Sequence, residues 1–395
     1  MPRWIYYLLI LAIVAPVLSL VGGTHLEMAI FICSALGIIP LAALIGQATE
    51  DLEYYVGPIA GGLLNATFGN APELIIGIFA LQQGLISVVK ASITGSIISN
   101  SLLVLGGSLA LGGWRWGEQY FNNRDAGQYS AMMVMAVAGL LIPFAASSAI
   151  KNPHNIEFIS IAISIVLFII YIMYLALHVF HVHAKRRNPR HLRTQQKSTA
   201  STKQLTHPAK EEEEEDSEEE EKQGVSAITG GVDPHRVDEH KKPNLWLALL
   251  MLLIATIGTT WNSELLVGAI TPVAQQLGWS TIFIGLVIIP IVGNAAEHGS
   301  SLIVAYKDRV DLSMAIAAGS SIQVATFVAP LLVFLSLFFA HSLNLIFQPL
   351  ELVLLGLATI LFTFVSLDGK SSWLAGMQLI AVYIMACVVF FFIAG

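Results

Sequence analysis

The sequence predicts an all-α polytopic membrane protein of about eleven transmembrane helices, arranged as one extra N-terminal span and two inverted five-helix repeats. Three observations carry this prediction: an apolar composition, a series of apolar runs of membrane-spanning length, and an internal repeat. Of the 395 residues, 55% are hydrophobic and only 12% are charged, and the mean hydropathy is +0.71. Soluble domains carry about 25% charged residues, so the composition excludes an ordinary soluble protein.

The apolar runs are long enough to cross a bilayer, because a transmembrane helix needs about 20 predominantly apolar residues. Short loops separate them, apart from one long polar insert that cannot lie in hydrocarbon. The chain is therefore divided into an N-terminal span (1–24), a first repeat (25–183), the insert (184–243) and a second repeat (244–395). The predicted spans are 4–22, 26–49, 58–82, 88–112, 127–148, 156–181, 245–268, 281–305, 312–338, 345–366 and 372–394.

The two repeats are related by one constant shift along the chain, the shift that carries Asn70 onto Asn294. It places Gly69-Asn70-Ala71-Pro72-Glu73 on Gly293-Asn294-Ala295-Ala296-Glu297, and Gly95-Ser96 on Gly319-Ser320. Because each repeat has an odd number of spans, the second repeat must enter the membrane from the opposite side. Equivalent helices then run antiparallel, which is the inverted-repeat architecture of secondary transporters.

The insert is predicted to be cytoplasmic, since Lys and Arg accumulate in short cytoplasmic loops. It holds 12 of the 20 Lys and Arg residues of the chain. Counting spans outward from the insert places the N-terminus on the cytoplasmic side and the C-terminus on the external or lumenal side. Lys90 and Lys151 are the exceptions to the positive-inside distribution. The first span is expected to be an uncleaved helix, because no clean small-residue cleavage site follows it.

The repeated pentapeptide places an amide three residues before a carboxylate, so that both point the same way on a helix. Glu73 and Glu297 lie within apolar runs, where a carboxylate is costly and by default functional. Two facing carboxylates in a low dielectric cannot both stay ionised without a counter-charge, so they are expected to bind protons more tightly. A divalent cation can replace those protons at similar local charge. The pair predicts a metal site coupled to protons; neutral glutamates with structural hydrogen bonds are the alternative.

Neutral oxygens around the two glutamates are predicted to complete the metal site. Hard cations such as Ca²⁺ take about 6–8 oxygen ligands, whereas soft metals prefer thiolates and imidazoles. Cys33 and Cys387 lie in apolar runs and provide neither a disulfide framework nor a zinc site. For the serines, close packing of helices is the alternative role. The additional candidate ligands are Asn70, Asn294, Ser96, Ser99, Ser320 and Gln323.

Two differences break the symmetry of the motifs. His298 follows Glu297, whereas Leu74 follows Glu73. A histidine at this place is expected to take part in proton coupling with the glutamates or in the choice of cation; a structural core histidine is the alternative. Pro72 corresponds to Ala296, and a proline frees the carbonyl four residues back, so the two helices need not be kinked alike.

Two acidic segments lie outside the central motifs. Glu50 is a candidate entrance residue, because acidic groups at a mouth raise the local cation concentration; a solvated helix end is the alternative. An acidic run in the insert is a candidate regulatory Ca²⁺ sensor, although such blocks are usually disordered. Its acidic residues are Glu211, Glu212, Glu213, Glu214, Glu215, Asp216, Glu218, Glu219, Glu220 and Glu221.

These residues together resemble the Ca²⁺/H⁺ antiporter (cation/proton exchanger) family of the cation/Ca²⁺ exchanger superfamily. Asn294-Ala295-Ala296-Glu297-His298 is similar to the pattern of the proton-coupled branch. The resemblance implies a central site shared by the two glutamates, lined by the amides and hydroxyls named above, and Ca²⁺ extrusion driven by inward H⁺. Ser300 and Ser301 depart from the Ala or Val that is frequent there, which leaves cation preference open. The matching stretches are 48–50, 61–75, 293–298, 307–312, 319–325 and 368–374.

The sequence therefore predicts a secondary active antiporter that exchanges cytoplasmic Ca²⁺ for H⁺ by alternating access. Na⁺- or K⁺-coupled Ca²⁺ exchange, or Na⁺/H⁺ exchange, on the same fold is the alternative, and Mn²⁺ or other cations are alternative cargo. No P-loop motif occurs, and His298 has no second histidine at the spacing of a metal hydrolase, so no enzymatic activity is expected.

The predicted partners are membrane lipid and the transported ions; no resident cofactor and no nucleic acid are expected. The predicted location is a prokaryotic plasma (inner) membrane, with a vacuolar membrane as the alternative. The sequence does not determine the oligomeric state.

Overall fold

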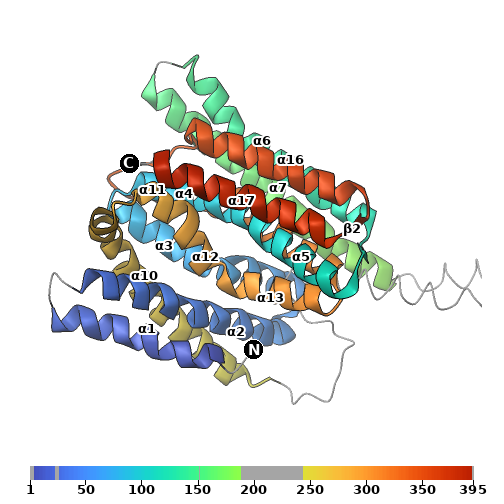
Figure 1. Cartoon of the computed structure of the whole chain (residues 1–395), viewed down its shortest axis with the longest axis horizontal. Coiled ribbons are helices and arrows are strands. Elements are labelled where there is room, and N and C mark those ends of the chain that lie inside the picture. Colours follow the sequence, from blue (N-terminus) through green and yellow to red (C-terminus); the bar gives the residue numbers. More distant parts are fainter. Residues whose placement is uncertain (1–3, 23–25, 151, 188–242, 394–395) are drawn as a thin grey trace, which may run out of the picture.

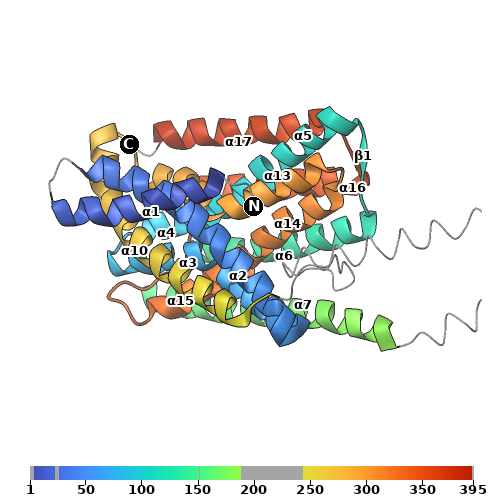
Figure 2. The same ribbon diagram turned by 90° about the horizontal axis from the view of Figure 1, so that it is seen from below.

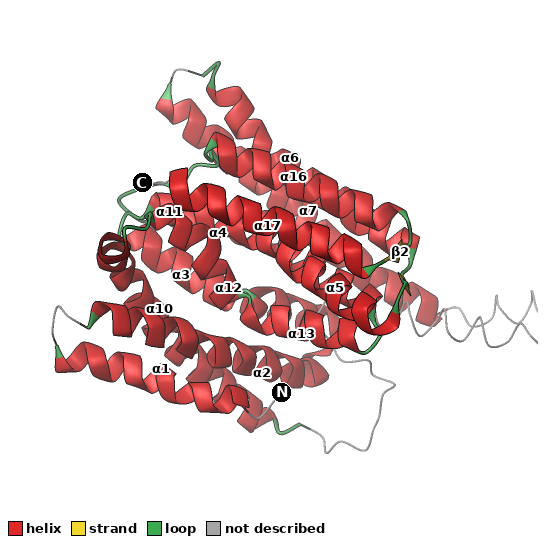
Figure 3. Cartoon of the chain, viewed as in Figure 1, coloured by secondary structure: helices red, strands yellow, loops and turns green. Residues whose placement is uncertain are grey.

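The computed structural model describes residues 4–22, 26–150, 152–187 and 243–393, and almost all of them are helical (Figures 1 and 3). The prediction of an all-α polytopic fold is confirmed. The acidic run at 211–221 lies outside the described residues, so its regulatory role stays a prediction.

An N-terminal helix and a first set of elements precede the insert. Helix α2 is bent at Gly57, whose φ of 79° is readily adopted only by glycine. The elements are α1 (Trp4–Val21), α2 (Glu27–Gly69), α3 (Ala71–Gln82), α4 (Ile86–Ile98), the π-helix η1 (Ser99–Val104), α5 (Leu105–Trp116), β1 (Gln119–Tyr120), α6 (Asn123–Ser147) and α7 (Pro153–Arg187).

The second half repeats the order of the helices around the two motifs at the same constant shift, whereas β2 follows α16 and β1 precedes α6. It contains α10 (Leu245–Leu277), α11 (Thr281–Phe283), the π-helix η2 (Ile284–Ile288), α12 (Ile289–Gly293), α13 (Ala295–Tyr306), α14 (Val310–Gln323), the π-helix η3 (Val324–Val328), α15 (Ala329–Ser336), α16 (Pro349–Leu367), β2 (Lys370–Ser371) and α17 (Trp373–Ile393).

The two halves share their irregular features as well as their helices. Both have a helix break at the Gly-Asn pair, and the π-helices η1 and η3 occupy equivalent places in the following span. Eight helices in the described part of the chain are long and apolar enough to span a membrane, or ten if each of two bent pairs is one span. The predicted number of eleven is reached only if the shorter helix α1 also crosses the membrane.

The spans α4–η1–α5 and α14–η3–α15 form the centre of the bundle. About nine-tenths of the most apolar window of the first and 83% of that of the second are buried, against 28% for α7, α10 and α17. Figure 1 shows α4 and α5 behind α16 and α17, with α1 and α2 along the other side. Polar residues placed on the central spans are thus screened from lipid by the outer helices.

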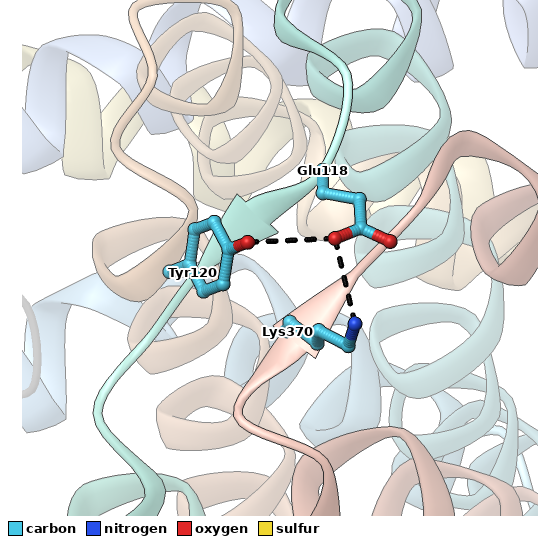
Figure 4. A network of polar contacts seen from close by, with 3 residues as sticks. All are labelled: Glu118, Tyr120 and Lys370. Atoms are coloured by element: carbon cyan, nitrogen blue, oxygen red, sulfur yellow. Dashed lines mark hydrogen bonds and ion pairs between the residues drawn. The ribbon is translucent and has the colours of Figure 1, made fainter.

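One end of the bundle, here called the strand face, is defined by the pairing of β1 with β2. Tyr120 lies opposite Lys370 in this short antiparallel ladder. The Lys370 ammonium lies 3.4 Å from a carboxylate oxygen of Glu118, which also accepts a 3.4 Å hydrogen bond from the Tyr120 hydroxyl (Figure 4). The turn after α13 lies at the same end, because Trp116 donates to the carbonyl of Tyr306.

The other end, here called the loop face, is closed by the segment between α15 and α16. The Lys90 ammonium donates 2.7 Å hydrogen bonds to the Asn344 side chain and to the Ile346 carbonyl. Lys90 is an exception to the positive-inside distribution, and these contacts give it a structural role in holding the loop face together. Both faces join segments that span counting places on the same side of the membrane. Figure 2 shows the bundle from below, with the strand face at the right end.

Candidate cation site

The site begins at two helix breaks that face each other across the halves. Asn70 (φ −100°, ψ 18°) separates α2 from α3, and Asn294 (φ −93°, ψ 11°) separates α12 from α13. The flanking helices are bent by 51° and 60°. The bend is at least as large where Ala296 replaces Pro72, so the Gly-Asn pair and not the proline makes the break. Pro72 lies in the first turn of α3, where no helical hydrogen bond is lost.

Each break puts a glutamate in the first turn of the helix that follows it. Glu73 is buried, whereas Glu297 is half-buried. The Glu73 carboxylate lies against Gly293, four residues before Glu297, where an added Cβ would stand 2.7 Å from its Oε1. Among the described residues, both carboxylate oxygens of Glu73 and the Oε2 of Glu297 have no hydrogen-bond partner. Such orphaned buried oxygens are costly unless a proton or a cation occupies them, so the chemistry of the pair fits cation and proton binding.

Amide and hydroxyl groups of the two halves interlock around the carboxylates. The Asn70 side chain donates to Gln323 (2.8 Å), and the Asn294 side chain donates to Ser96 (3.2 Å). Ser320 donates a longer bond of 3.4 Å to Asn294. Each of the two amides therefore reaches the second motif of the opposite half. The structure brings together the candidate ligands that sequence reasoning selected in separate segments.

Ser99 is the candidate ligand with the weakest case. Its hydroxyl is fully buried and donates to the backbone carbonyl of Ser96 at 3.2 Å, within its own helix. This bond fits the packing role as well as the ligand role. Glu50, the candidate entrance residue, is exposed on α2 before the bend at Gly57 and lies outside the hydrogen-bond network of the site.

Asn100 is a site residue that sequence reasoning did not select. Its amide nitrogen donates to Ser320 (2.9 Å), and its oxygen lies 3.1 Å from Nε2 of His298. With its amide nitrogen facing Ser320, Asn100 presents an acceptor to the imidazole, so Nε2 of His298 carries the proton in this bond. His298 therefore reaches the site through Asn100 and Ser320. The sequence clue that could have identified Asn100 as a site residue is its position directly after Ser99, a candidate ligand.

The described residues hold no cluster of three or more His, Cys, Asp or Glu side chains. The charged groups of the site are two carboxylates, and the other candidate metal ligands are neutral oxygens. This set suits a hard cation such as Ca²⁺ better than a soft metal.

The fold and this site define a membrane cation exchanger built from inverted repeats. The family model described as sodium/calcium exchanger protein matches residues 26–180 and 247–392, and the chain belongs to this family. The two matched segments leave out α1 and the whole insert at 184–243.

Individual relatives cover nearly the whole chain. The Ca(2+)/H(+) antiporter of Aphanothece halophytica is 39% identical over 371 residues, which cover 93% of this chain and 91% of that protein. The Ca(2+)/H(+) antiporter ChaA of Bacillus subtilis is 38% identical and covers 98% of this chain and 99% of its own. The solved structure of YfkE superposes with a TM-score of 0.74 at 34% identity, over 97% of this chain and 99% of that one.

Proposed function

We propose that this membrane protein exchanges Ca²⁺ for H⁺ at one central site formed by Glu73 and Glu297. The observation that carries the proposal is that three buried oxygens of this carboxylate pair have no hydrogen-bond partner among the described residues. Two relatives that are 38–39% identical are named Ca(2+)/H(+) antiporters, which supports the same pair of ions here.

The exchange follows from charge at the site. With both carboxylates ionised, two negative charges face each other and a divalent cation neutralises them. Each carboxylate that takes up a proton loses its charge and its attraction for the cation, so protonation releases Ca²⁺. Because one site holds either the metal or the protons, opening it alternately to the two sides couples their movements. The neutral amides and hydroxyls complete the coordination shell in the metal-bound state.

The direction of transport rests on the distribution of charge along the chain. We propose that the strand face is cytoplasmic, together with the N-terminus and the insert at 184–243, because five Lys and Arg residues closely follow span 156–181. Cytoplasmic Ca²⁺ then leaves the cell against inward H⁺. A prokaryotic plasma membrane is the proposed location.

The test uses purified protein in liposomes with an imposed pH gradient. Uptake of radioactive Ca²⁺ should follow the gradient in the wild type and should be abolished by Glu73→Gln and by Glu297→Gln, since an amide can neither carry the charge nor exchange a proton. Glu351→Gln is the matched control. Glu351 is also a buried intramembrane carboxylate, but it accepts a bond from the backbone of Gln348 in a helix cap.

Robust pH-driven Ca²⁺ uptake by either of the two site variants would refute the two-glutamate site. Replacing the pH gradient with a Na⁺ gradient separates the alternative coupling on the same fold: uptake driven by Na⁺ and indifferent to pH would replace H⁺ with Na⁺ as the counter-ion. Competition by Mn²⁺, Na⁺ and K⁺ in the same assay defines the cargo.

A further inference from the structure

A groove lies between α6 and α16, two neighbouring helices at the outer side of the bundle away from α1 (Figure 1). It is lined by α6 between Asn123 and Ala138 and by α16 between Thr363 and Leu367, and its volume is about 680 Å³. Only 39% of the most apolar window of each helix is buried, so both helices present much of their surface outward. In a membrane protein, a groove at this place faces lipid.

The walls of the groove are apolar, although three of the lining residues carry hydroxyls. Ser130, Thr363 and Ser366 each donate to the carbonyl four residues earlier in their own helix, at 2.8–2.9 Å. The side chains left facing outward are hydrocarbon, such as Val134 (49% exposed) and Leu367 (63% exposed). Water and ions find few hydrogen-bond partners on such walls, so an apolar occupant fits the groove best.

The groove begins at the strand face and ends within the membrane. Its strand-face end lies at Asn123 and Leu367, because α6 closely follows β1 and α16 leads into β2. From Asn123 to Ala138 an α-helix rises about 22 Å at 1.5 Å per residue. One leaflet contributes about 15 Å of hydrocarbon, so the groove covers the depth reached by a lipid acyl chain. Tyr120 and Trp373, exposed at the same end, are residue types that lie at the level of the lipid head groups.

Two charges flank the strand-face end of the groove. Arg124 and Asp368 each directly follow a lining residue, and both are exposed. Neither forms an ion pair within the described part of the chain, whereas Lys370 at the same end is paired with Glu118. Asp125 lines a separate cavity. A guanidinium binds phosphate and a carboxylate binds an ammonium group, so the charges complement a zwitterionic head group.

We propose that this groove binds one acyl chain of a phospholipid from the strand-face leaflet, with the phosphate at Arg124 and a primary ammonium at Asp368. This is the chemistry of phosphatidylethanolamine. The acyl chain occupies the space that the side chains leave between α6 and α16, and the head group stays at the membrane surface. The site goes beyond the proposed exchange of ions, uses none of the residues of the cation site, and is tested without transport.

Photolabelling of the wild-type protein tests the occupant directly. The protein is reconstituted in phosphatidylcholine nanodiscs that contain a small fraction of phosphatidylethanolamine with a diazirine in its acyl chain, and labelled residues are identified by peptide mass spectrometry. Label should concentrate at 127–138 and 363–367. Ile384 and Val388, exposed on the outer helix α17, sample bulk lipid and should carry several-fold less label. Even labelling of α6, α16 and α17 would overturn the site.

Filling the groove tests its place on the molecule. Gly127→Leu adds a side chain in open space, because an added Cβ at Gly127 meets no atom within 4 Å. Gly356→Leu is the matched control: Gly356 is a glycine of α16 outside the groove, and its added Cβ also meets no atom within 4 Å. The first variant should lose the label at 127–138 and the second should keep it. Equal labelling of the two variants would overturn the site.

A second copy of this chain is the other possible occupant of the groove. In that case the groove of the wild type would stay unlabelled, and Gly127→Leu would lower the oligomeric mass measured by light scattering. This pair of results would overturn the lipid site and assign the groove to an interface between copies.

Competition by unlabelled lipids in detergent tests the head group. Phosphatidylethanolamine should compete about two- to fivefold better than phosphatidylcholine, as expected for one exposed ion pair, because the methylated ammonium of phosphatidylcholine donates no hydrogen bond. Asp368→Asn should remove this preference. Arg124→Gln should weaken both lipids toward the level of diacylglycerol, which has no phosphate. Unchanged competition in both variants would overturn the assignment of the head group.

Discussion

Glu73 and Glu297 occupy equivalent positions after equivalent helix breaks, but they do not have equivalent surroundings. Glu73 is 4% exposed and lies against Gly293 of the opposite half, where an added Cβ would stand 2.7 Å from its Oε1. Glu297 is half-buried, and Gly69, the counterpart of Gly293, faces Asn65 and not a carboxylate. The backbone repeat thus supplies two similar carboxylate positions, while the side chains around them bury Glu73 and leave Glu297 partly exposed.

The largest expected effect comes from adding one methyl group at Gly293. The nearest atom to a new Cβ is the end of the flexible Glu73 side chain, so the chain should fold while the carboxylate is displaced. Metal affinity depends strongly on groups that orient its ligands, and their loss costs about 10- to 100-fold. Gly293→Ala should therefore raise the Ca²⁺ concentration needed for half-maximal uptake by about that factor.

Gly69→Ala is the matched control, because its Cβ would meet Asn65 Oδ1 at an ordinary 3.5 Å. Its Ca²⁺ dependence should stay close to that of the wild type. Equal Ca²⁺ dependence in both variants would show that the close contact between Glu73 and Gly293 does not position the carboxylate. Unfolding temperature, measured on the same samples, separates displacement of the carboxylate from loss of the fold.

The central motif was predictable from the sequence because its residues are rare in apolar runs and recur at one shift. Glu73, Glu297, Asn70 and Asn294 needed no structure to be selected. Asn100 was not selected, because Val324 stands at its equivalent position and the repeat gave no second copy to support it. The contact of Glu73 with Gly293 could not be predicted either, since a glycine has no side chain that would indicate a contact. The two residues also lie in separate halves of the chain.

A smaller effect is expected from making the two halves alike at His298 and Asn100. His298→Leu alone leaves the Asn100 oxygen buried without its donor, and Asn100→Val alone leaves His298 without its acceptor. A buried polar group without a partner costs about 1–3 kcal/mol. The double variant reproduces the equivalent apolar pair, Leu74 and Val324, so it should recover much of that stability.

The measurement is a double-mutant cycle on unfolding in detergent, with pH-driven Ca²⁺ uptake as a second readout. Coupling of about 1 kcal/mol or more between the two sites is expected for residues in direct contact. Additive effects would show that the hydrogen bond contributes nothing. A double variant that is stable but slow in exchange would indicate that the polar pair serves ion exchange and not only the packing.

The smallest expected effect compares two lysines at opposite ends of the molecule. Half-buried Lys90 holds the loop face through two 2.7 Å hydrogen bonds, whereas Lys370 makes an exposed ion pair at the strand face. Lys90→Met, which copies the equivalent Met314, should lower stability by about 1.5–3 kcal/mol, as for hydrogen bonds to a charged group. Lys370→Met should change stability by less than about 1 kcal/mol, as for surface pairs. Thermal unfolding of both proteins in detergent at two salt concentrations provides the comparison. Equal and small losses in both variants would mean that the loop face does not depend on the Lys90 contacts, and that apolar packing alone holds it closed.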